Sequence, residues 1–343
     1  MPNYENIAGL VIDEITQKSK NKLYQRDYAA WKSDVLGMRT YERMQEIMDV
    51  ALFGDKNRTA IKSSNGVSKS FEGALSIVWS SCVFPLGEML SIVTAPSVPQ
   101  IERVIFGYIK SFYNRMIDMK LDPPGFILEN ATWQYKTPAG QRILVAGRKP
   151  PDQNAVSAFQ GLRSEYGRTY VWGDEAGGLS KQMYTAFEAV LTGADSRLLL
   201  TGNPDNATGQ FREIFDEAKY DQDYNKFTIS AFELPGFTGE VVYPDDAKMQ
   251  RRIMQALTTR EWVEQKKRLW GESDPRYRSK VLGEFSDIGN FNYFSQSTLS
   301  RAWENNIPKD LAVRPILGVD VGRMGDDTTD VFINYNGNCR IYV

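Results

Sequence analysis

Apolar positions recur along this chain with two different periods. Between residues 22 and 53 they follow the spacing of an amphipathic helix, with one apolar face made by Leu23, Tyr24, Tyr28, Trp31, Val35 and Leu36. Beyond residue 56, short apolar runs bounded by turn residues alternate with longer helical patterns. The chain is therefore predicted to begin with helices and to continue as an alternation of strands and helices.

The alternation predicts a particular fold class. The expected strands are 58–62, 90–95, 169–172 and 197–201, the expected helices are 71–83, 100–119 and 181–191, and a hairpin is expected from 132–136 and 142–146. Strands that alternate with helices favour an α/β fold, with a mostly parallel sheet covered by helices on both faces. Residues 245–285 are helical and charged, and new strands are expected in "PILGVDVG", "VFINYNG" and "CRIYV".

Composition narrows the possible classes of protein. The chain has 343 residues, 42% of them hydrophobic, which suffices for one large or two ordinary domains. Its net charge of −2 confines any nucleic-acid contact to a local patch. Two distant cysteines, Cys82 and Cys339, indicate a reducing compartment. No apolar run approaches the roughly 18 residues of a membrane span, and the acidic N-terminus lacks the basic region of a signal peptide.

The chain contains no histidine, and this absence excludes several chemistries. Ser-His-Asp triads, Cys-His dyads and His-ligated zinc cannot form within it. Carboxylate, lysine, arginine and backbone groups remain, and these often act with magnesium. Phosphoryl transfer and metal-dependent phosphodiester cleavage fit that inventory.

The segment "SSNGVSKS", residues 63–70, lies between the first expected strand and the next helix. It follows the phosphate-loop pattern G-x-x-x-x-G-K-[ST] with serines at both glycine positions. In such a loop Lys69 reaches the β- and γ-phosphates and the Ser70 hydroxyl binds Mg²⁺. The backbone N–H groups that cradle the phosphates would come from Ser64, Asn65, Gly66, Val67 and Ser68. The alternative is an ordinary helix start.

Two later strands end in polar residues that could complete this site. One is followed by Asp174 and Glu175, which could hold Mg²⁺ with Ser70 and polarise an attacking water, respectively. The other ends in "TGNP", where Asn203 would lie on the ligand edge of a parallel sheet and could sense the γ-phosphate. The alternative in each case is a polar turn without function.

These segments, with "FQGLRSEYGRTYVWGDEAGG", "LLLTGNPDNATGQF", "WVEQKKRLWGESDPRYRSKVLGEF" and "ILGVDVGRMGDDTTD", resemble the large terminase subunit of tailed bacteriophages over residues 40–343. The resemblance implies an ASCE-type P-loop NTPase that hydrolyses ATP with Mg²⁺ to pump double-stranded DNA into a preformed procapsid. It implies an N-terminal helical segment (1–55), an ATPase core (56–235), a helical lid or linker (236–312) and the start of an RNase H-like nuclease domain (313–343).

The resemblance also implies roles for individual residues. Lys69 and Ser70 would bind phosphate and magnesium, Asp174 would be the Walker B acid and Glu175 the catalytic glutamate. The remaining roles would be a coupling segment at Thr201 and Asn203, an adenine-reading glutamine at Gln45, and an arginine finger for the neighbouring subunit at Arg163, with Arg148 as second candidate.

The last residues resemble the beginning of a two-metal nuclease. Asp320 would be its first Mg²⁺- or Mn²⁺-binding acid, and Asp327, in the turn with Asp326, could approach the same site. The other acids of such a site would follow beyond residue 343, so we expect no endonuclease activity from this chain.

The implied partners are double-stranded DNA, the portal protein of the procapsid, the small terminase subunit and further copies of the chain in a ring. No membrane is expected, and the implied location is the cytoplasm of the infected bacterial host. Basic clusters that could contact DNA lie at 110–115, 142–149 and 251–280, although a solvated helix face is the simpler interpretation. Two alternatives stay open: another P-loop DNA translocase or helicase, and a non-hydrolysing structural component that docks to the portal.

Overall fold

The structure is a computed structural model that describes residues 20–149, 159, 161–162, 164 and 167–286, together with the backbone of three strands between residues 316 and 342. The chain divides into two compact units, Met1–Asn290 and Phe291–Val343. Within the described residues, no helix is both long and apolar enough to span a membrane.

An eight-stranded sheet forms the centre of the first unit. Its strands are β1 (Arg58–Ser63), β2 (Met89–Thr94), β3 (Phe126–Leu128), β4 (Thr132–Thr137), β5 (Gly140–Gly147), β6 (Arg168–Gly173), β7 (Arg197–Gly202) and β8 (Tyr224–Ile229). The order is β3-β4-β5-β2-β6-β7-β1-β8. Only the β3–β4 and β4–β5 pairs are antiparallel, so the predicted mostly parallel α/β sheet is confirmed.

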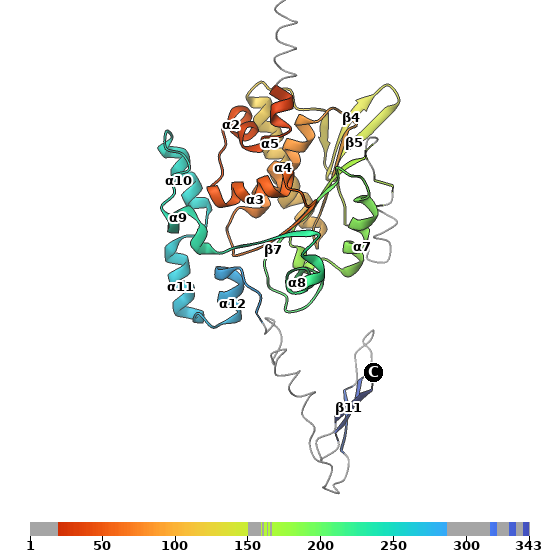
Figure 1. Ribbon diagram of the computed structural model, residues 1–343, viewed down its shortest axis with the longest axis vertical. Helices are drawn as coiled ribbons and strands as arrows, with labels where there is room; N and C mark the ends of the chain where they lie inside the picture. Colours follow the sequence, from red (N-terminus) through yellow and green to blue (C-terminus); the bar gives the residue numbers. More distant parts are fainter. Residues whose placement is uncertain are drawn as a thin grey trace, which may run out of the picture. The chain divides into compact units, whose positions relative to one another are not determined.

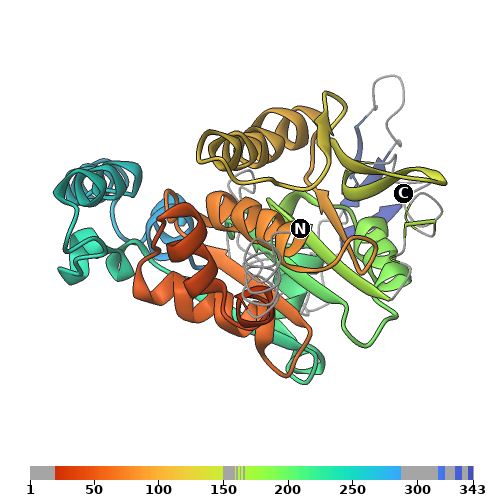
Figure 2. The same ribbon diagram turned by 90° about the horizontal axis from the view of Figure 1, so that it is seen from above.

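Helices cover both faces of this sheet (Figures 1 and 2). One face packs against α2 (Tyr28–Leu36), α3 (Glu42–Phe53), α4 (Lys69–Val83) and α5 (Phe106–Asp118), and the other against α7 (Lys181–Val190) and α8 (Gln210–Asp216). Successive residues of β6 serve the two cores alternately: Tyr170 and Trp172 point into the first and Val171 into the second. This alternation follows from the two-residue period of a strand, and it explains why the central residues of β6 are apolar on both faces of the sheet.

Several elements differ from the sequence expectation, among them β3 and α8, which were not predicted. The helix expected at 100–119 begins with a π-helical stretch, Gln100–Ile105, before α5. Strand β8 was not predicted, because it is an edge strand whose polar residues are only half-buried and it therefore lacks an apolar run.

After β8 the chain forms a helical layer that we call the lid segment, residues 235–283. It contains α9 (Pro235–Thr238), α10 (Ala247–Ala256), α11 (Arg260–Trp270), α12 (Pro275–Tyr277) and a π-helical turn, Arg278–Leu282. The second unit contains a three-stranded antiparallel sheet of β9 (Ile316–Asp320), β10 (Thr329–Ile333) and β11 (Cys339–Tyr342), in the order β11-β10-β9. Asp320 ends β9, but its side chain, with Asp326 and Asp327, lies outside the described residues.

The contact between α4 and the sheet depends on a glycine. A Cβ placed on Gly73 would lie 2.3 Å from two ring atoms of Trp172, a fully buried side chain on β6. The absence of a side chain at this position lets α4, and the loop before it, lie close to the sheet.

We predict that Gly73→Ala lowers the free energy of unfolding by about 1–3 kcal/mol, because overpacking outweighs the better helix propensity of alanine. Gly107→Ala in α5 is the matched control, because no atom lies within 4 Å of its Cβ position, and it should gain roughly 0.5–1 kcal/mol. Urea denaturation of both variants measures the difference. Equal gains in the two variants would contradict the packing argument.

Candidate functional site

Polar residues gather where three adjacent parallel strands end. Strands β6, β7 and β1 are neighbours in the sheet, so their carboxyl ends lie along one edge. The loop after β1 leads into Lys69 and Ser70, β6 leads into Asp174, and β7 ends next to Asn203. The structure thus brings together residues that are separated by more than a hundred positions in the sequence.

Asp174 is the centre of this group and is fully buried. Its Oδ2 accepts a hydrogen bond from Ser70 Oγ at 2.8 Å, and its Oδ1 accepts one from Thr201 Oγ1, also at 2.8 Å. Thr201 Oγ1 in turn accepts from Trp172 Nε1 at 2.9 Å, so the indole fixes the hydroxyl that orients the carboxylate. A hydroxyl beside a carboxylate is an oxygen donor set that suits Mg²⁺.

Lys69 lies beside this carboxylate and is held by the end of β7. Its Nζ donates to Asn203 Oδ1 at 2.9 Å, while Asn203 Nδ2 donates to Ser63 O at 2.7 Å and to Asn65 Oδ1 at 3.1 Å. Burial lowers the pKa of Lys69, and the nearby Glu175 and Asp174 oppose that change. An anion bound here would stabilise the charged lysine.

The loop itself contains two residues with positive φ, Gly66 at +61° and Ser68 at +65°. Ser68 therefore adopts the left-handed conformation for which the phosphate-loop pattern places a glycine. The N–H of Ser64 donates to Ile229 O at 2.8 Å and that of Asn65 to Lys280 O at 2.9 Å. The backbone N–H groups of these two predicted cradle residues are thus bonded to β8 and to the lid segment.

Glu175 follows Asp174 and has φ of +50°, so that it lies, like Ser68, in the left-handed region. Burial raises the pKa of its carboxyl group, the charge of Lys69 lowers it, and Asp174 raises it further. A partly buried carboxylate with a raised pKa is suited to accept a proton near neutral pH.

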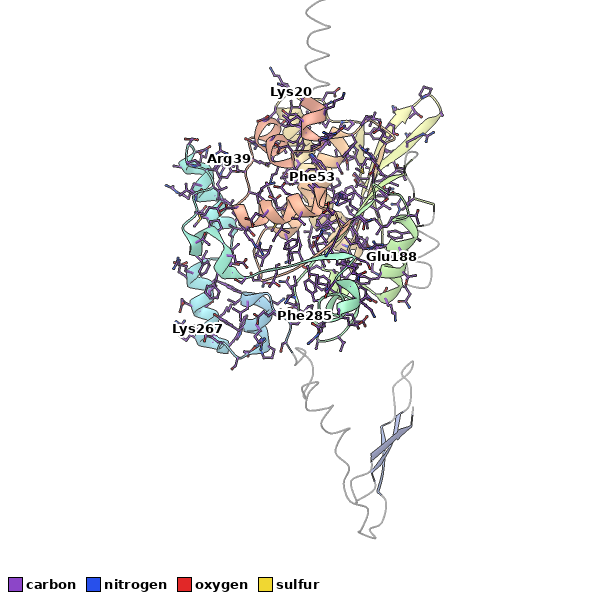
Figure 3. The ribbon with its side chains drawn as sticks, viewed as in Figure 1. Lys20, Arg39, Phe53, Glu188, Lys267 and Phe285 are labelled. Atoms are coloured by element: carbon purple, nitrogen blue, oxygen red, sulfur yellow. The ribbon has the colours of Figure 1, made fainter. Side chains whose placement is uncertain are left out.

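The lid segment closes one side of the loop. Thr258 donates its backbone N–H to Gly66 O at 3.1 Å and its hydroxyl to Asn65 O at 2.6 Å. Gly283, at φ +69°, approaches so closely that a Cβ would lie 2.9 Å from Ser64 N. Phe285, two residues further on, is labelled in Figure 3. Its ring packs against that of Phe211 in α8, with centroids 6.0 Å apart.

A second set of contacts joins the lid segment to the "TGNPD" turn. Asp205 accepts hydrogen bonds from Ser279 Oγ and from Lys280 Nζ, the latter at 2.5 Å. Sequence reasoning missed Asp205, Thr258 and Lys280. Asp205 directly follows "TGNP" and Lys280 lies in "RSKVLGEF", but only Thr201 and Asn203 of these segments were given a role, and no signal marked Thr258.

Among the described residues, Gln45 and Arg148 are not brought to this group. Gln45 donates to Asp49 Oδ1 at 2.8 Å on its own helix. Arg148 follows β5, which is separated from β1 by three strands, and its Nη1 donates to Gly147 O. Arg163 lies outside the described residues. The predicted roles of all three stay predictions.

A cavity of about 250 Å³ adjoins Ser68. Its lining is largely apolar, with Phe71, Tyr108 and Leu257 among its residues. Tyr243, also in the lining, bridges to the N-terminal segment, where its hydroxyl donates to Arg39 O at 3.1 Å. Gln45 does not contribute to this lining.

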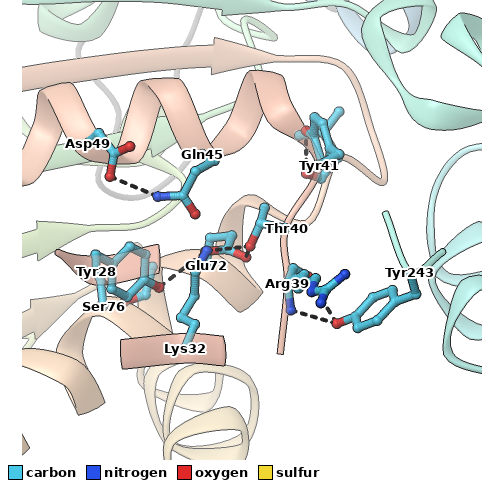
Figure 4. A network of polar contacts seen from close by, with 12 residues as sticks. Tyr28, Lys32, Arg39, Thr40, Tyr41, Gln45, Asp49, Glu72, Ser76 and Tyr243 are labelled. Carbon is cyan, nitrogen blue, oxygen red and sulfur yellow. Dashed lines mark hydrogen bonds and ion pairs between the residues drawn. The ribbon is translucent and has the colours of Figure 1, made fainter. Parts of the chain in front are cut away.

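A buried polar network connects the first turn of α4 to the N-terminal helices (Figure 4). Lys32 of α2, only 1% exposed, forms an ion pair at 3.4 Å with Glu72 of α4. Glu72 also accepts hydrogen bonds from Tyr28 and Thr40. Nearby, Tyr41 donates its hydroxyl to Val67 O at 3.0 Å. The N-terminal helices therefore fix both α4 and the loop that precedes it.

Comparison with solved structures finds large terminases of two phages. The ATPase domain of the large terminase of Thermus phage P74-26 is 15% identical, with a TM-score of 0.46, over 73% of this chain and 100% of that one. The large terminase of a thermophilic bacteriophage, solved in complex with ADP, is 12% identical, with a TM-score of 0.49, over 89% of this chain and 68% of that one. No family model and no curated protein matches. The function of the site is therefore inferred from its own residues.

We predict that Lys32→Met destabilises the protein by about 3–5 kcal/mol, because it leaves the Glu72 carboxylate buried without its cation. Adding Glu72→Gln should restore part of that loss, since no buried charge then remains. Chemical denaturation of the single and double variants measures this coupling.

The matched control is Glu46→Gln, which breaks only a partly exposed ion pair with Arg43 and should change stability by about 1 kcal/mol or less. If the losses in free energy of unfolding from Lys32→Met and from Glu72→Gln simply add in the double variant, the two side chains do not act as a buried pair.

Proposed function

We propose that the first unit binds ATP with Mg²⁺ at the carboxyl edge of its sheet and hydrolyses it. The observation that carries this proposal is the pair of contacts Ser70–Asp174 and Lys69–Asn203 at adjacent strand ends. Together they place a hydroxyl, a carboxylate and a cation next to a loop that opens a helix. A helix N-terminus that follows such a loop is a favourable place for phosphate groups.

Each residue has a role in this proposal. Lys69 exchanges Asn203 for the phosphate oxygens. Ser70 and Asp174 hold Mg²⁺, and Thr201 keeps the carboxylate oriented toward it. Mg²⁺ held by these two residues would supply positive charge that offsets the negative charge of the phosphates. Its fit is supported by the donor set, one hydroxyl and one carboxylate, which leaves places for water and phosphate oxygens.

Glu175 is the proposed base that orients and polarises the attacking water. Its raised pKa supports this role, because a carboxylate with higher proton affinity accepts a proton more readily. Asn203, now bonded to Lys69, would lose that partner when phosphate binds. The contacts of the "TGNPD" turn with neighbouring segments would then depend on whether phosphate is bound.

The wider function proposed is the ATP-driven movement of double-stranded viral DNA into a procapsid, through the portal protein and with the small terminase subunit. Its support is the resemblance of the sequence to the large terminase subunit. In this proposal Arg163 or Arg148 completes the site of a neighbouring copy in a ring. The adenine base has two candidate locations, beside Gln45 or in the apolar cavity next to Ser68.

The proposed domain limits follow the same resemblance: an ATPase core at 56–235 after the helical segment 1–55, a lid or linker at 236–312, and the beginning of a nuclease domain at 313–343. In that domain Asp320 is the proposed first metal-binding acid. Its place at the end of β9 suits that role.

We predict that Lys69→Ala abolishes ATP hydrolysis by removing phosphate binding, whereas Glu175→Gln retains ATP binding and lowers kcat by about 10²–10⁴-fold. Steady-state ATPase rates and nucleotide titrations, with DNA and portal protein present, measure both effects. Lys181→Ala, an exposed lysine at the start of α7, is the control. Activity that survives both site variants would overturn the assignment, and an inactive unmodified chain would favour a non-hydrolysing structural component.

We also predict that Glu175→Gln stabilises the protein at neutral pH. A folded-state pKa above the unfolded one contributes stability only at low pH, and that contribution is lost as pH rises through the raised value. Glutamine does not titrate, so the gain should be full above the raised pKa and vanish below about pH 4.5, the ordinary range of glutamate. Denaturation midpoints between pH 4.5 and 8 test this. A gain independent of pH would point to relief of backbone strain instead.

A further inference from the structure

Two lysines from distant parts of the chain are held by the same turn. Lys69 donates to Asn203, and Lys280 of the lid segment forms an ion pair at 2.5 Å with Asp205, two residues further on. The backbone of Lys280 is also fixed at the loop, where its carbonyl accepts the N–H of Asn65 at 2.9 Å. The Lys280 side chain therefore starts from the wall of the candidate phosphate site.

The Lys280–Asp205 pair differs from the other ion pair near the loop in its exposure. Its side chains are 26% and 32% exposed, against 1% and 3% for Lys32 and Glu72. A partly solvated pair contributes little net stability and is easily exchanged for a stronger partner. A triphosphate carries more charge than a single carboxylate and so offers such a partner.

The positive charge of Lys280 acts on both Lys69 and Glu175. It contributes to lowering the pKa of Lys69, after the larger effect of burial, and it lowers the pKa of Glu175. Two cations thus lie close enough to act on one bound anion, and in its absence the nearby carboxylates of Asp174, Glu175 and Asp205 balance their charge.

No residue of the loop supplies a second cation. Residues 63–68 are serine, serine, asparagine, glycine, valine and serine. Lys62, just before them, places its Nζ 5.4 Å from the ring centroids of both Phe215 and Phe285, in contact with the second core rather than the loop. In the part of the chain that the structure describes, Lys280 is the cation best placed to supplement Lys69.

We propose that Lys280 is a second phosphate-binding cation, supplied by the lid segment of the same chain, and that Asp205 is its partner when no triphosphate is bound. When a nucleoside triphosphate binds, Lys280 leaves Asp205 for a terminal phosphate oxygen. The exchange breaks one ion pair and forms another, with no covalent step. This inference rests on the proposed function and names how the site distinguishes a triphosphate from a diphosphate.

The proposed exchange also changes how the lid segment is held. Its backbone is bonded to the loop through Asn65, Gly66 and Thr258, whereas its link to the "TGNPD" turn runs through Asp205. Loss of the terminal phosphate returns Lys280 to Asp205 and restores that link. The lid segment is then held to the turn by Lys280 and Ser279 together when the site holds a diphosphate or nothing, and by Ser279 alone when it holds a triphosphate.

The test compares the affinities of Mg²⁺-ADP and Mg²⁺-ATPγS by calorimetry in the full chain. Lys280→Gln should leave the dissociation constant for ADP within about 2-fold and weaken ATPγS about tenfold, because only the triphosphate reaches this cation. ATP turnover should fall by about 10²-fold, a size seen when one charge-stabilising donor is removed. Lys280→Arg should recover most of the preference for ATPγS.

Asp205→Asn separates phosphate binding from a purely structural role. It keeps the cation and removes the competing carboxylate, so ATPγS should bind more tightly than to the unmodified chain. If Lys280 only holds the lid segment in place through its ion pair with Asp205, then Asp205→Asn and Lys280→Gln should each weaken the binding of ADP and of ATPγS by the same factor.

The remaining outcomes are distinct. An unmodified chain that binds and hydrolyses ATP, with a Lys280→Gln variant of unchanged ADP-to-ATPγS preference, would overturn this inference alone. An unmodified chain that binds neither nucleotide would overturn the proposed function and this inference together.

Discussion

The burial of one carboxylate constrains the whole sheet edge. Asp174 has no exposed surface, and a buried charge without partners costs several kcal/mol. Its partners are two hydroxyl groups, Ser70 from the helix after β1 and Thr201 from β7. Because side chains alternate along a strand, a shift of one residue in the register of β7 would turn Thr201 to the other face. Strand order, register and loop position are therefore tied to the same three side chains.

Around that fixed centre, the loop has two supports of different character. The N-terminal helices hold it through the Lys32–Glu72 pair, which is sealed from solvent and satisfied on both sides. The lid segment holds it through backbone bonds and through the more exposed Lys280–Asp205 pair. The buried pair suits a permanent anchor, because separating it would expose two unpaired charges to an apolar core. The solvated pair can separate at small cost, so movement is expected on the lid side.

The sequence predicted the strand ends well and the contacts between distant segments poorly. Asp174 and Asn203 could be found because each follows a short apolar run, and parallel strands bring such ends to one edge. Strand β8 was missed because half-buried edge residues need no apolar pattern. The pairing of Asp205 with Lys280 spans 75 positions and depends on how the lid segment packs. No local sequence pattern predicts that packing, and the charged helices of the lid segment are equally consistent with a solvated surface.

At Ser68, backbone strain and conformational entropy affect stability in opposite directions. A serine in the left-handed region is strained by about 1–2 kcal/mol, whereas a glycine would lose more conformational entropy on folding, by roughly 0.4–1 kcal/mol. The two effects oppose each other, so the loop geometry does not require the glycine that usually marks it. Under the proposed function, a phosphate loop of this kind would escape any search that relies on glycine spacing. It is better recognised by the carboxylate that meets the serine and the amide that meets the lysine across the sheet edge.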